Sequence, residues 1–489
     1  MPSQKENSTG YRWLVRDGVT SQVMTSLHSG AFLVAFILLL GGTNFHVGLM
    51  ASFPFLTQLL QLPSICLVDR IGQRKLISFL GAALARLLWI PLMALPLVLA
   101  GSEALKWAVV VFFLSSCLAA VSNCGWSSWT RDTLPSEKQG RLMSNRMRLQ
   151  LGAAMAASLA AGYLLTYWKR VFPAFELHGY LLVFLVGTVL GLAGAYSLAR
   201  IPEPVTPPPA EPFSLRKILA KALQDDNFRR LLHFLAAWSF AINLAAPFFA
   251  VYMLRRLGLP ISWVVVMTVI STLSNMLALN LWGGISDRFS NKSVLAVSGP
   301  LFFLGILAWP FAAIPETLIL TPVLLILIHV ALGVSMAGVT LASSNIALKL
   351  APEGEATGYL AVNAMTASLF SGVAALLGGG LAYLFASREL YLMLGYFESG
   401  SAREVSFPLL NLRGLDFLFF SAVLIGLYAT HRLALVREEG EVEEPIVVRE
   451  LLAEGMRGAG HLTTVGGPVR LTGFPFGRLI RFFNDFPER

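Results

Sequence analysis

The most regular feature of the chain is a series of long stretches without Asp, Glu, Lys or Arg. The first runs from Gly18 to Val68, which is long enough for two membrane-crossing helices with a turn near 43–46. A helix needs about 20 apolar residues to cross the ~30 Å hydrocarbon layer of a bilayer. The other stretches cover 76–102 (with Arg86 as its one charge), 107–130, 149–168, 177–199, 231–254, 257–286, 293–315, 317–348, 356–387 and 414–431 (with Asp416). This pattern predicts twelve membrane-spanning helices.

The charged residues that remain give the predicted membrane protein an orientation. Only 13% of the 489 residues are charged and 55% are hydrophobic, whereas soluble domains carry about 25% charged residues. Lys and Arg (37) outnumber Asp and Glu (28), and most of them fall in the N-terminal tail, the central linker and the loops on that same side. This bias follows the positive-inside rule and does not require a nucleic-acid partner. We expect a multi-pass protein in the lipid bilayer of the inner (plasma) membrane, with both termini cytoplasmic, no nucleic acid bound, and residues 388–413 in an outer loop.

A proline-rich stretch divides the predicted helices into two groups of six. Residues 201–212 read IPEPVTPPPAEP, and the six prolines there prevent a continuous helix. A charged stretch with Lys217 and Lys221 follows and predicts a surface helix. The expected organisation is a cytoplasmic N-terminal tail (1–17), a six-helix bundle (18–199), a cytoplasmic Pro-rich linker (200–228), a second six-helix bundle (229–435) and a cytoplasmic C-terminal tail (436–489).

Two related motifs follow the second and the eighth predicted helices. The first reads DRIGQRK at 69–75 and the second reads GGISDRFSNK at 283–292. Both resemble the signature of the major facilitator superfamily of membrane transporters, with Ile65 and Ser290 each replacing one signature glycine. The stretch from Trp126 to Arg146 resembles an uncharacterised bacterial branch of that superfamily. The matching signature residues are Asp69, Arg70, Gly72, Arg74 and Lys75 in the first copy, and Gly283, Asp287, Arg288 and Lys292 in the second.

The resemblance implies an all-α membrane protein with twelve transmembrane helices in two pseudo-symmetric six-helix bundles. It also implies secondary active transport of a small organic solute by alternating access, in which the two bundles rock about a central site. The motifs would act as a gate. Asp69 would face the start of helix 11 and Asp287 the start of helix 5, because a helix N-terminus carries about half a positive charge. The cytoplasmic network expected around this gate is Arg131, Asp132, Arg146, Arg148, Glu355 and Gly358.

Polar residues inside the apolar stretches are candidates for a substrate or proton cavity. Arg86 lies about 15 Å into its span at 1.5 Å per residue and has no evident acidic partner, so it is either an anion-binding or a packing residue. His329 either couples protons or is a hydrogen-bonded core histidine. Polar residues in membrane helices often only join neighbouring helices. The other candidates are His28, Asn123, Asn243, Asn275 and Asn363.

The sequence contains no pattern for covalent chemistry or for a bound cofactor. The three cysteines lack metal-ligand spacing, and no phosphate-binding glycine loop is present. We therefore expect no catalytic residue, cofactor or metal, and a small-molecule solute as the partner of a functional monomer, with a proton or another ion as a candidate for coupling. Two alternatives stay open. One is a polytopic membrane enzyme using Glu103, Glu176 and His178 at the outer surface, and the other is a transporter-like scaffold or sensor.

Overall fold

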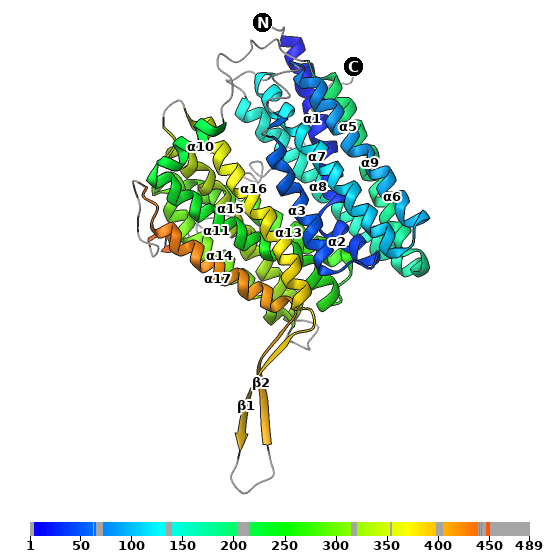
Figure 1. The fold of residues 1–489 in the computed structure, drawn as a ribbon, viewed down its shortest axis with the longest axis vertical. Coiled ribbons are helices and arrows are strands. Elements are labelled where there is room, and N and C mark those ends of the chain that lie inside the picture. Colours follow the sequence, from blue (N-terminus) through cyan, green and yellow to red (C-terminus); the bar gives the residue numbers. More distant parts are fainter. Residues whose placement is uncertain are drawn as a thin grey trace, which may run out of the picture.

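The computed structural model describes residues 4–61, 63–64, 72–133, 139–202, 215–313, 320–352, 355–397, 404–438, 440, 442 and 446–449. Within these ranges the chain forms long helices and one β-hairpin (Figure 1). Eleven helices in these ranges are long and apolar enough to cross a membrane. In addition, α3 (Asn44–Leu56) and the 3-10 turn η1 (Thr57–Leu60) occupy the position of the second predicted span. The twelve-helix prediction therefore fits the described part of the chain.

Two spans of the N-terminal bundle are interrupted where the sequence disturbs the helix. The first changes from α1 to α2 at Gly30, whose φ of +56° is a conformation that favours glycine. The third changes from α5 to α6 just before Pro91, which has no N–H to donate to Leu87. The bundle contains α1 (Gln4–His28), α2 (Gly30–Leu39), α3, α5 (Arg74–Leu87), α6 (Trp89–Val98), α7 (Gly101–Thr133), α8 (Gln139–Val171), η2 (Pro173–Phe175) and α9 (Glu176–Arg200).

The first span begins earlier than the charge-free stretch that starts at Gly18. Helix α1 already begins at Gln4, and the segment able to cross a membrane runs from Gly10 to Leu39. Asp17 is therefore part of the packed helix and is only 4% exposed. Burial removes a carboxylate from water, so it must be balanced by hydrogen bonds or opposite charge. The sequence did not indicate that this position needs such partners.

The C-terminal bundle is preceded by a short helix of the linker. Helix α10 (Leu215–Gln224) forms where a surface helix was predicted. Asp225 then starts α11, because its carboxylate accepts hydrogen bonds from the backbone N–H groups of Asn227 and Phe228. The bundle contains α11 (Asp226–Ala245), α12 (Pro247–Val251), η3 (Tyr252–Arg256), α13 (Ile261–Arg288), α14 (Asn291–Leu307), η4 (Pro310–Ala313), α15 (Leu320–Lys349), α16 (Ala356–Leu384) and α17 (Leu415–Ala434).

A β-hairpin connects α16 to α17 and extends away from the helices (Figure 1). Its strands are β1 (Glu389–Phe397) and β2 (Glu404–Arg413), which pair antiparallel with Glu389 opposite Arg413. The hairpin stands in a region that was expected to be an outer loop, so its strands are an addition to the predicted fold. We call the end of the molecule that carries it the hairpin end, and the end at which α1 begins the opposite end.

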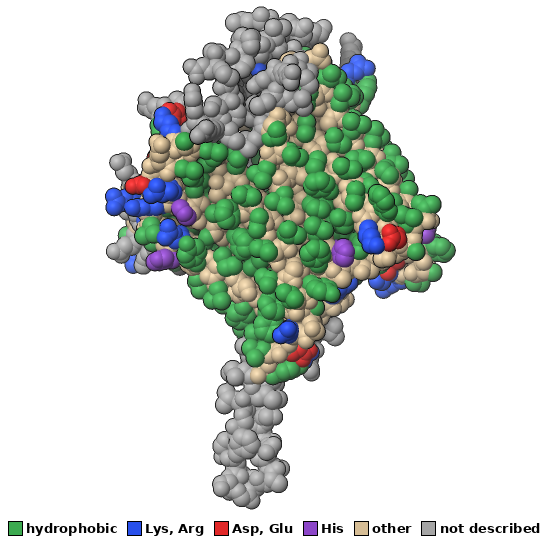
Figure 2. Space-filling model, viewed as in Figure 1, with side chains coloured by type: hydrophobic (Ala, Val, Ile, Leu, Met, Phe, Trp, Pro, Cys, Tyr) green, Lys and Arg blue, Asp and Glu red, His purple; other side chains and the backbone are tan. Residues whose placement is uncertain are grey.

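The outside of the helical body is strongly apolar. Many large hydrophobic side chains are exposed, among them Leu97 of α6 (60%), Leu277 of α13 (60%) and Leu424 of α17 (67%). Figure 2 shows such side chains covering the face in view, with charged side chains gathered near its margins. In water a surface of this kind would drive association, whereas the lipid of a bilayer covers it. The exterior therefore agrees with a multi-pass membrane protein.

The two bundles touch through unusually close packing of α3 against α16. A Cβ atom added at Gly48 would lie 2.5 Å from the carbonyl oxygen of Ala375 and 2.5 Å from the Cα of Gly379. Two backbones can approach this closely only where both helices carry small residues. The glycine pair Gly48 and Gly379 therefore fixes how tightly the bundles close against each other.

Hydrogen bonds between the bundles lie beside this helix pair and beside the pair α8 and α13. The side-chain amide of Asn44 donates to the carbonyl of Ala382 (3.1 Å). The backbone N–H of Ser262 donates to the hydroxyl of Thr166 (3.2 Å). Asn44 begins α3 and contacts the last turn of α16, which leads into the hairpin, and Ser262 lies at the start of α13. These contacts join the two bundles at the hairpin end.

Candidate functional site

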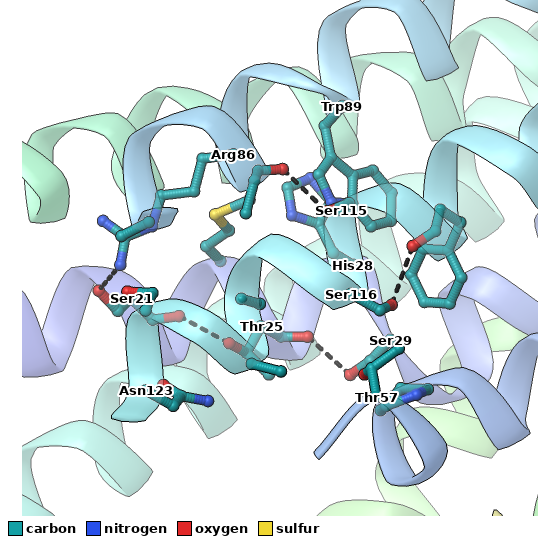
Figure 3. A pocket seen from close by; sticks show the side chains of 18 of the residues that line it. Ser21, Thr25, His28, Ser29, Thr57, Arg86, Trp89, Ser115, Ser116 and Asn123 are labelled. Atoms are coloured by element: carbon teal, nitrogen blue, oxygen red, sulfur yellow. Dashed lines mark hydrogen bonds between the residues drawn. The ribbon is translucent and has the colours of Figure 1, made fainter. Parts of the chain in front are cut away.

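A cavity of about 400 Å³ lies inside the N-terminal bundle. It is lined by residues of α1, α3, η1, α5, α6 and α7 and is partly open, and Figure 3 shows the polar side chains around it. Three predicted cavity residues, His28, Arg86 and Asn123, come together here. The full lining is Ser21, Met24, Thr25, His28, Ser29, Pro54, Thr57, Gln58, Ala82, Ala85, Arg86, Trp89, Phe112, Ser115, Ser116, Ala119, Ala120, Ser122 and Asn123.

Arg86 has an acidic partner, so the expectation that it lacks one is wrong. Its Nη2 lies 3.8 Å from Oδ1 of Asp17 and donates to the hydroxyl of Ser21 at 2.8 Å. Ser21 in turn donates to Asp17 at 2.9 Å, and Nη1 of Arg86 donates to the carbonyl of Gly191. The partner was missed because Asp17 precedes the charge-free stretch and was assigned to the tail.

Asp17 is shared with a second guanidinium, that of Arg146. Nη2 of Arg146 lies 3.8 Å from Oδ2 of Asp17, and its Nε donates to the carbonyl of Leu14 at 3.1 Å. The guanidinium also lies over the ring of Trp126, 5.0 Å from the ring centroid. A side chain at Gly18 would collide with Arg146, because a Cβ there would be 2.5 Å from Nε. The three charged groups form one buried cluster, which we call the Asp17 cluster: Asp17, Arg86 and Arg146.

Hydroxyl groups make up most of the remaining polar surface of the cavity. Thr25 and Ser29 donate to carbonyls one turn earlier in α1, at 2.9 and 2.6 Å. Ser115 donates to the carbonyl of Ala85 at 2.8 Å, and Ser116 to that of Phe112 at 2.9 Å. A hydroxyl has a single proton to donate. With that proton already used, these oxygens offer a solute hydrogen-bond acceptors.

His28 adds an aromatic wall to the cavity together with Trp89. The two rings stack with centroids 3.9 Å apart and planes at 20°. Nε2 of His28 lies 2.8 Å from the carbonyl oxygen of Phe184. A carbonyl only accepts, so Nε2 carries the proton and Nδ1 of the neutral ring is an acceptor. Nδ1 is buried and has no hydrogen-bond partner in the described part of the chain.

The edge of the cavity reaches the other bundle at Gln58. This side chain lines the cavity, and its Oε1 accepts a hydrogen bond of 2.9 Å from the hydroxyl of Ser368 on α16. A movement of one bundle against the other would therefore break or remake a contact at the wall of the cavity.

The predicted cavity residues of the C-terminal bundle are not brought together with these three. Asn243 donates to the carbonyl of Ser239 (2.8 Å) and to the hydroxyl of Ser371 on α16 (2.9 Å). Asn275 donates to the carbonyl of Gly333 at 3.3 Å. Both join helices within one bundle. The side-chain oxygen of Asn363 is buried without a hydrogen-bond partner in the described residues.

His329 is enclosed in the aromatic core of the C-terminal bundle. It is 5% exposed, its Nδ1 lies 2.8 Å from the carbonyl of Leu325, and its ring packs edge-on against Trp309 with centroids 5.4 Å apart. These contacts favour the hydrogen-bonded core histidine over the proton-coupling role.

The residues of the two signature motifs that the structure describes lie at the opposite end from the hairpin. Asp69 and Arg70 fall outside the described residues. Gly72 has a φ of +70°, which favours glycine, and Arg74 starts α5 with Lys75 behind it. In the second copy, Gly283 and the pair Asp287 and Arg288 form the last turns of α13. Asp287 is exposed.

Lys292 of the second copy is held by the last residue of α17 and by the segment that follows it. The Glu438 carboxylate accepts from the backbone N–H of Lys292 at 2.7 Å, and Nζ of Lys292 donates to the carbonyl of Ala434 at 3.2 Å. Glu438 also pairs with Lys349 at 3.1 Å. The start of the C-terminal tail is thus packed on the bundle.

The predicted cytoplasmic network is divided among separate groups in this structure. Arg146 belongs to the Asp17 cluster, and Arg148 donates to Ser144 at 3.2 Å. Glu355 receives a hydrogen bond from Lys221 of α10, which raises the pKa of the Lys221 ammonium above its ordinary value. Gly358 donates its backbone N–H to the carbonyl of Glu355 in the first turn of α16 (2.9 Å). The side chains of Arg131 and Asp132 fall outside the described part of the structure.

A second cavity, of about 370 Å³, lies between the bundles at the hairpin end. Its charged lining residues are already engaged. Lys169 pairs with Glu176 at 2.9 Å, and Arg255 donates to the carbonyl of Gly42 at 3.2 Å.

The acidic residues considered for an enzyme site are Glu176, which lines this second cavity, and Glu103, which pairs with Lys106 at 2.7 Å. Glu103 and Glu176 are thus held in separate ion pairs. Among the described residues, no group of three or more His, Cys, Asp or Glu could hold a metal ion.

The family is decided by a match along most of the chain. A profile of the family described as Major Facilitator Superfamily matches residues 19–375. The chain belongs to the major facilitator superfamily. Membership in this superfamily agrees with the twelve-helix fold, and it classes the protein as a membrane transporter. No curated protein matches the chain.

Solved structures of superfamily transporters have the same fold. The nucleoside transporter NupG matches with a TM-score of 0.62 and 11% identity, over 88% of this chain and 98% of that one. A bacterial homologue of the human lysosomal transporter Spinster, inward-facing and unoccupied, matches with 0.62 and 13%, over 93% and 99%. A bacterial homologue of the iron transporter ferroportin, inward-facing, matches with 0.61 and 13%, over 89% and 99%. At these identities the likeness concerns the fold alone.

Several residues of the site were missed by reasoning from sequence. These are Asp17, the partner of the lining residue Arg86, and the hydroxyl residues of α1 and α7 that line the cavity. A signal was present, since Ser21, Thr25 and Ser29 recur every fourth residue and thus lie on one face of a helix. A polar face on an apolar helix indicates a cavity more specifically than any single polar residue does.

Proposed function

We propose that the protein is a secondary carrier that moves a small polar organic solute across the membrane by alternating access. The observation that carries this proposal is that, among the described residues, the bundles touch at the hairpin end and along the helix pair α3 and α16. The close helix pair at Gly48 and Gly379 and the hydrogen bond from Asn44 to Ala382 are at the hairpin end. The cavity edge at Gln58 lies further along the same helix pair. Rocking about this region would expose the cavity first to one side and then to the other.

The gating motifs would hold the alternate state, in which the opposite end is closed. In the described state Asp287 is exposed at the end of α13, which is what an open latch requires. In the alternate state Asp287 would face the N-terminus of α8, and the helix dipole would supply about 1 kcal/mol. Asp69 would make the equivalent contact with the start of α16 near Gly358.

The described state is joined at the hairpin end, and the basic residues favour an orientation in which the opposite end faces the cytoplasm. In that orientation the described state is inward-facing. With both termini cytoplasmic, the hairpin end lies on the outer face of the bacterial inner membrane. The hairpin β1–β2 would then project outward, and the motif loops with α10 would lie in the cytoplasm. The carrier would work as a monomer, because one chain contains both bundles and the cavity.

The nature of the cavity supports a polar organic solute. The related structures are those of a nucleoside transporter and of a homologue of an iron transporter, and at 11–13% identity neither solute is assigned to this chain. The lining combines hydroxyl acceptors, two amides and the stacked rings of His28 and Trp89. Pockets of about 300–1,000 Å³ with apolar walls and a few polar groups hold small organic molecules.

The test is a flux screen in proteoliposomes. The purified protein would be reconstituted and offered labelled solutes by class, with and without a pH gradient, against liposomes that lack the protein. We expect saturable uptake of at least one solute class, and counterflow when that solute is loaded inside. A protein that binds partners through its tail but moves no solute in either direction would be a scaffold or sensor, and the carrier proposal would be wrong.

A further inference from the structure

The Asp17 cluster contains more positive than negative charge. Two guanidinium groups, those of Arg86 and Arg146, share the single carboxylate of Asp17 at 3.8 Å each. The side chains are only 14%, 11% and 6% exposed, respectively. In the described part of the chain this cluster carries a net charge of about +1. Buried charges are normally matched by an opposite charge, because leaving one unmatched away from water is costly.

Arg86 presents this excess charge to the cavity. It is the one charged side chain among the described residues that line it, and its guanidinium lies at one end of the cavity beside Ser21 (Figure 3). Hydrogen bonds to Gly191 and Ser21 use two of its five N–H donors. The distance of 3.8 Å to Asp17 is an ion pair and is too long for a hydrogen bond. An incoming carboxylate can therefore take the planar, two-pronged contact that a guanidinium favours.

The glycines of α9 show how the chain places Arg86 at this point. A Cβ added at Gly194 would lie 3.1 Å from Nη1 of Arg86 and 2.7 Å from the hydroxyl of Thr20. Larger residues on this face of α9 would push the guanidinium away from Asp17 and Ser21. The arrangement holds the charged group at the cavity end, whereas an arginine that only packs against lipid would extend its head toward the interface.

The other side chains that line the cavity determine which groups the uncharged part of the ligand must carry. The hydroxyl oxygens of Thr25, Ser29, Ser115 and Ser116 have donated their protons to backbone carbonyls and accept hydrogen bonds. A matching ligand carries donors, which are hydroxyl or amino groups. The stacked rings of His28 and Trp89 bound the space with an apolar wall.

We propose that the cavity binds a small organic acid that carries hydroxyl or amino groups, with its carboxylate on Arg86. This deepens the carrier proposal, on which it rests for the transport of the ligand. The binding itself can be measured without transport. The ligand would neutralise the excess charge of the Asp17 cluster, and its donors would meet the hydroxyl oxygens of α1 and α7.

The experiment compares acids with uncharged counterparts of similar shape on the purified full chain in detergent. The probes are lactate against lactamide, gluconate against sorbitol, and glutamate against glutamine, at constant ionic strength. The melting temperature is followed by intrinsic tryptophan fluorescence, and the apparent Kd is taken from its dependence on ligand concentration. We expect at least one acid to raise the melting temperature at concentrations where its counterpart does not.

Variants separate the guanidinium contact from a general effect of charge. Arg86→Gln should weaken the binding of that acid about 10- to 100-fold, the usual range for losing a charged hydrogen-bonded contact. Arg86→Lys should retain part of the affinity. The matched control is Arg170→Gln, at an exposed position at the far end of α8, and it should bind as the unaltered protein does. Arg86→Gln leaves Asp17 paired with Arg146, so we expect it to fold.

Two results would overturn the inference. One is that no acid in the panel stabilises the unaltered protein more than its counterpart, a comparison that needs no variant. The other is that Arg86→Gln keeps full affinity for the acid. Failure of the carrier proposal is distinguishable, because then an acid would bind in detergent but no flux would follow in liposomes. Conversely, flux of uncharged solutes without acid binding would retain the carrier and refute the acid.

Discussion

The substitution Gly48→Ala tests whether close packing at the hairpin end holds the described state. A Cβ at this position would lie 2.5 Å from two backbone atoms of α16, whereas ordinary contact begins at 3.4 Å. The helices α3 and α16 must therefore separate by about 0.9 Å, the difference between those distances. Backbone atoms cannot swing aside as a flexible side chain does, so the strain falls on the packing of the two bundles.

The expected size of the effect follows from the cost of overpacking. Forcing an extra methyl into a well-packed contact costs about 1–3 kcal/mol. In a state that is open at the hairpin end the contact is absent and the cost disappears. The population ratio should therefore shift toward that state by roughly 5- to 150-fold.

The assay is pulsed EPR on the protein in lipid nanodiscs. Spin labels at Tyr163 of α8 and Tyr383 of α16, which are 61% and 58% exposed, report the separation of the bundles at the hairpin end. Gly48→Ala should add a population with a longer distance. Gly380→Ala is the matched control, because a Cβ there meets nothing within 4 Å. Identical distance distributions in both variants would refute the reasoning.

Three further predictions follow from the buried charges and the motif. Asp17→Asn should lower the free energy of unfolding, measured by SDS titration, by about 3 kcal/mol, since it leaves two buried guanidinium groups without a counter-charge. An unchanged free energy of unfolding would show that Asp17 does not balance the charge of Arg86 and Arg146. Asp287→Asn should lower flux and shift the same EPR distances about fivefold toward the described state, because it removes about 1 kcal/mol from the alternate state; normal flux with unchanged distances would contradict the latch. His329→Gln should leave any dependence of flux on a pH gradient intact, and loss of that dependence would return this residue to proton coupling.

The helices were predictable because each depends on a local property of the sequence. A span across the bilayer requires a long run without charge, and the runs from 149 to 168 and from 177 to 199 mark α8 and α9 within a few turns. The hairpin was missed because 388–413 was read by its charges alone. Two apolar segments separated by the polar sequence Ser-Gly-Ser were a strand signal.

The cavity was only partly predictable because its residues come from helices far apart in the sequence. Arg86 was named from its depth in the span, but its partner Asp17 lies 69 positions earlier, and only the packing of α1 and α5 against α9 joins them. The C-terminal candidates show the opposite error. Asn243 and Asn275 were equally polar and equally central, yet their amides bond to neighbouring helices. Which way a polar residue faces depends on helix rotation, which a single sequence does not specify.

A reversible crosslink at the hairpin end tests the central claim most directly. Cysteines would replace the exposed residues Phe45 and Tyr383, on either side of the bundle contact, in a background without the three native cysteines. A short reducible thiol crosslinker would then join the bundles in proteoliposomes. If transport requires the bundles to separate there, the crosslinked protein moves no solute and reduction restores the flux. Undiminished flux through fully crosslinked protein would contradict alternating access.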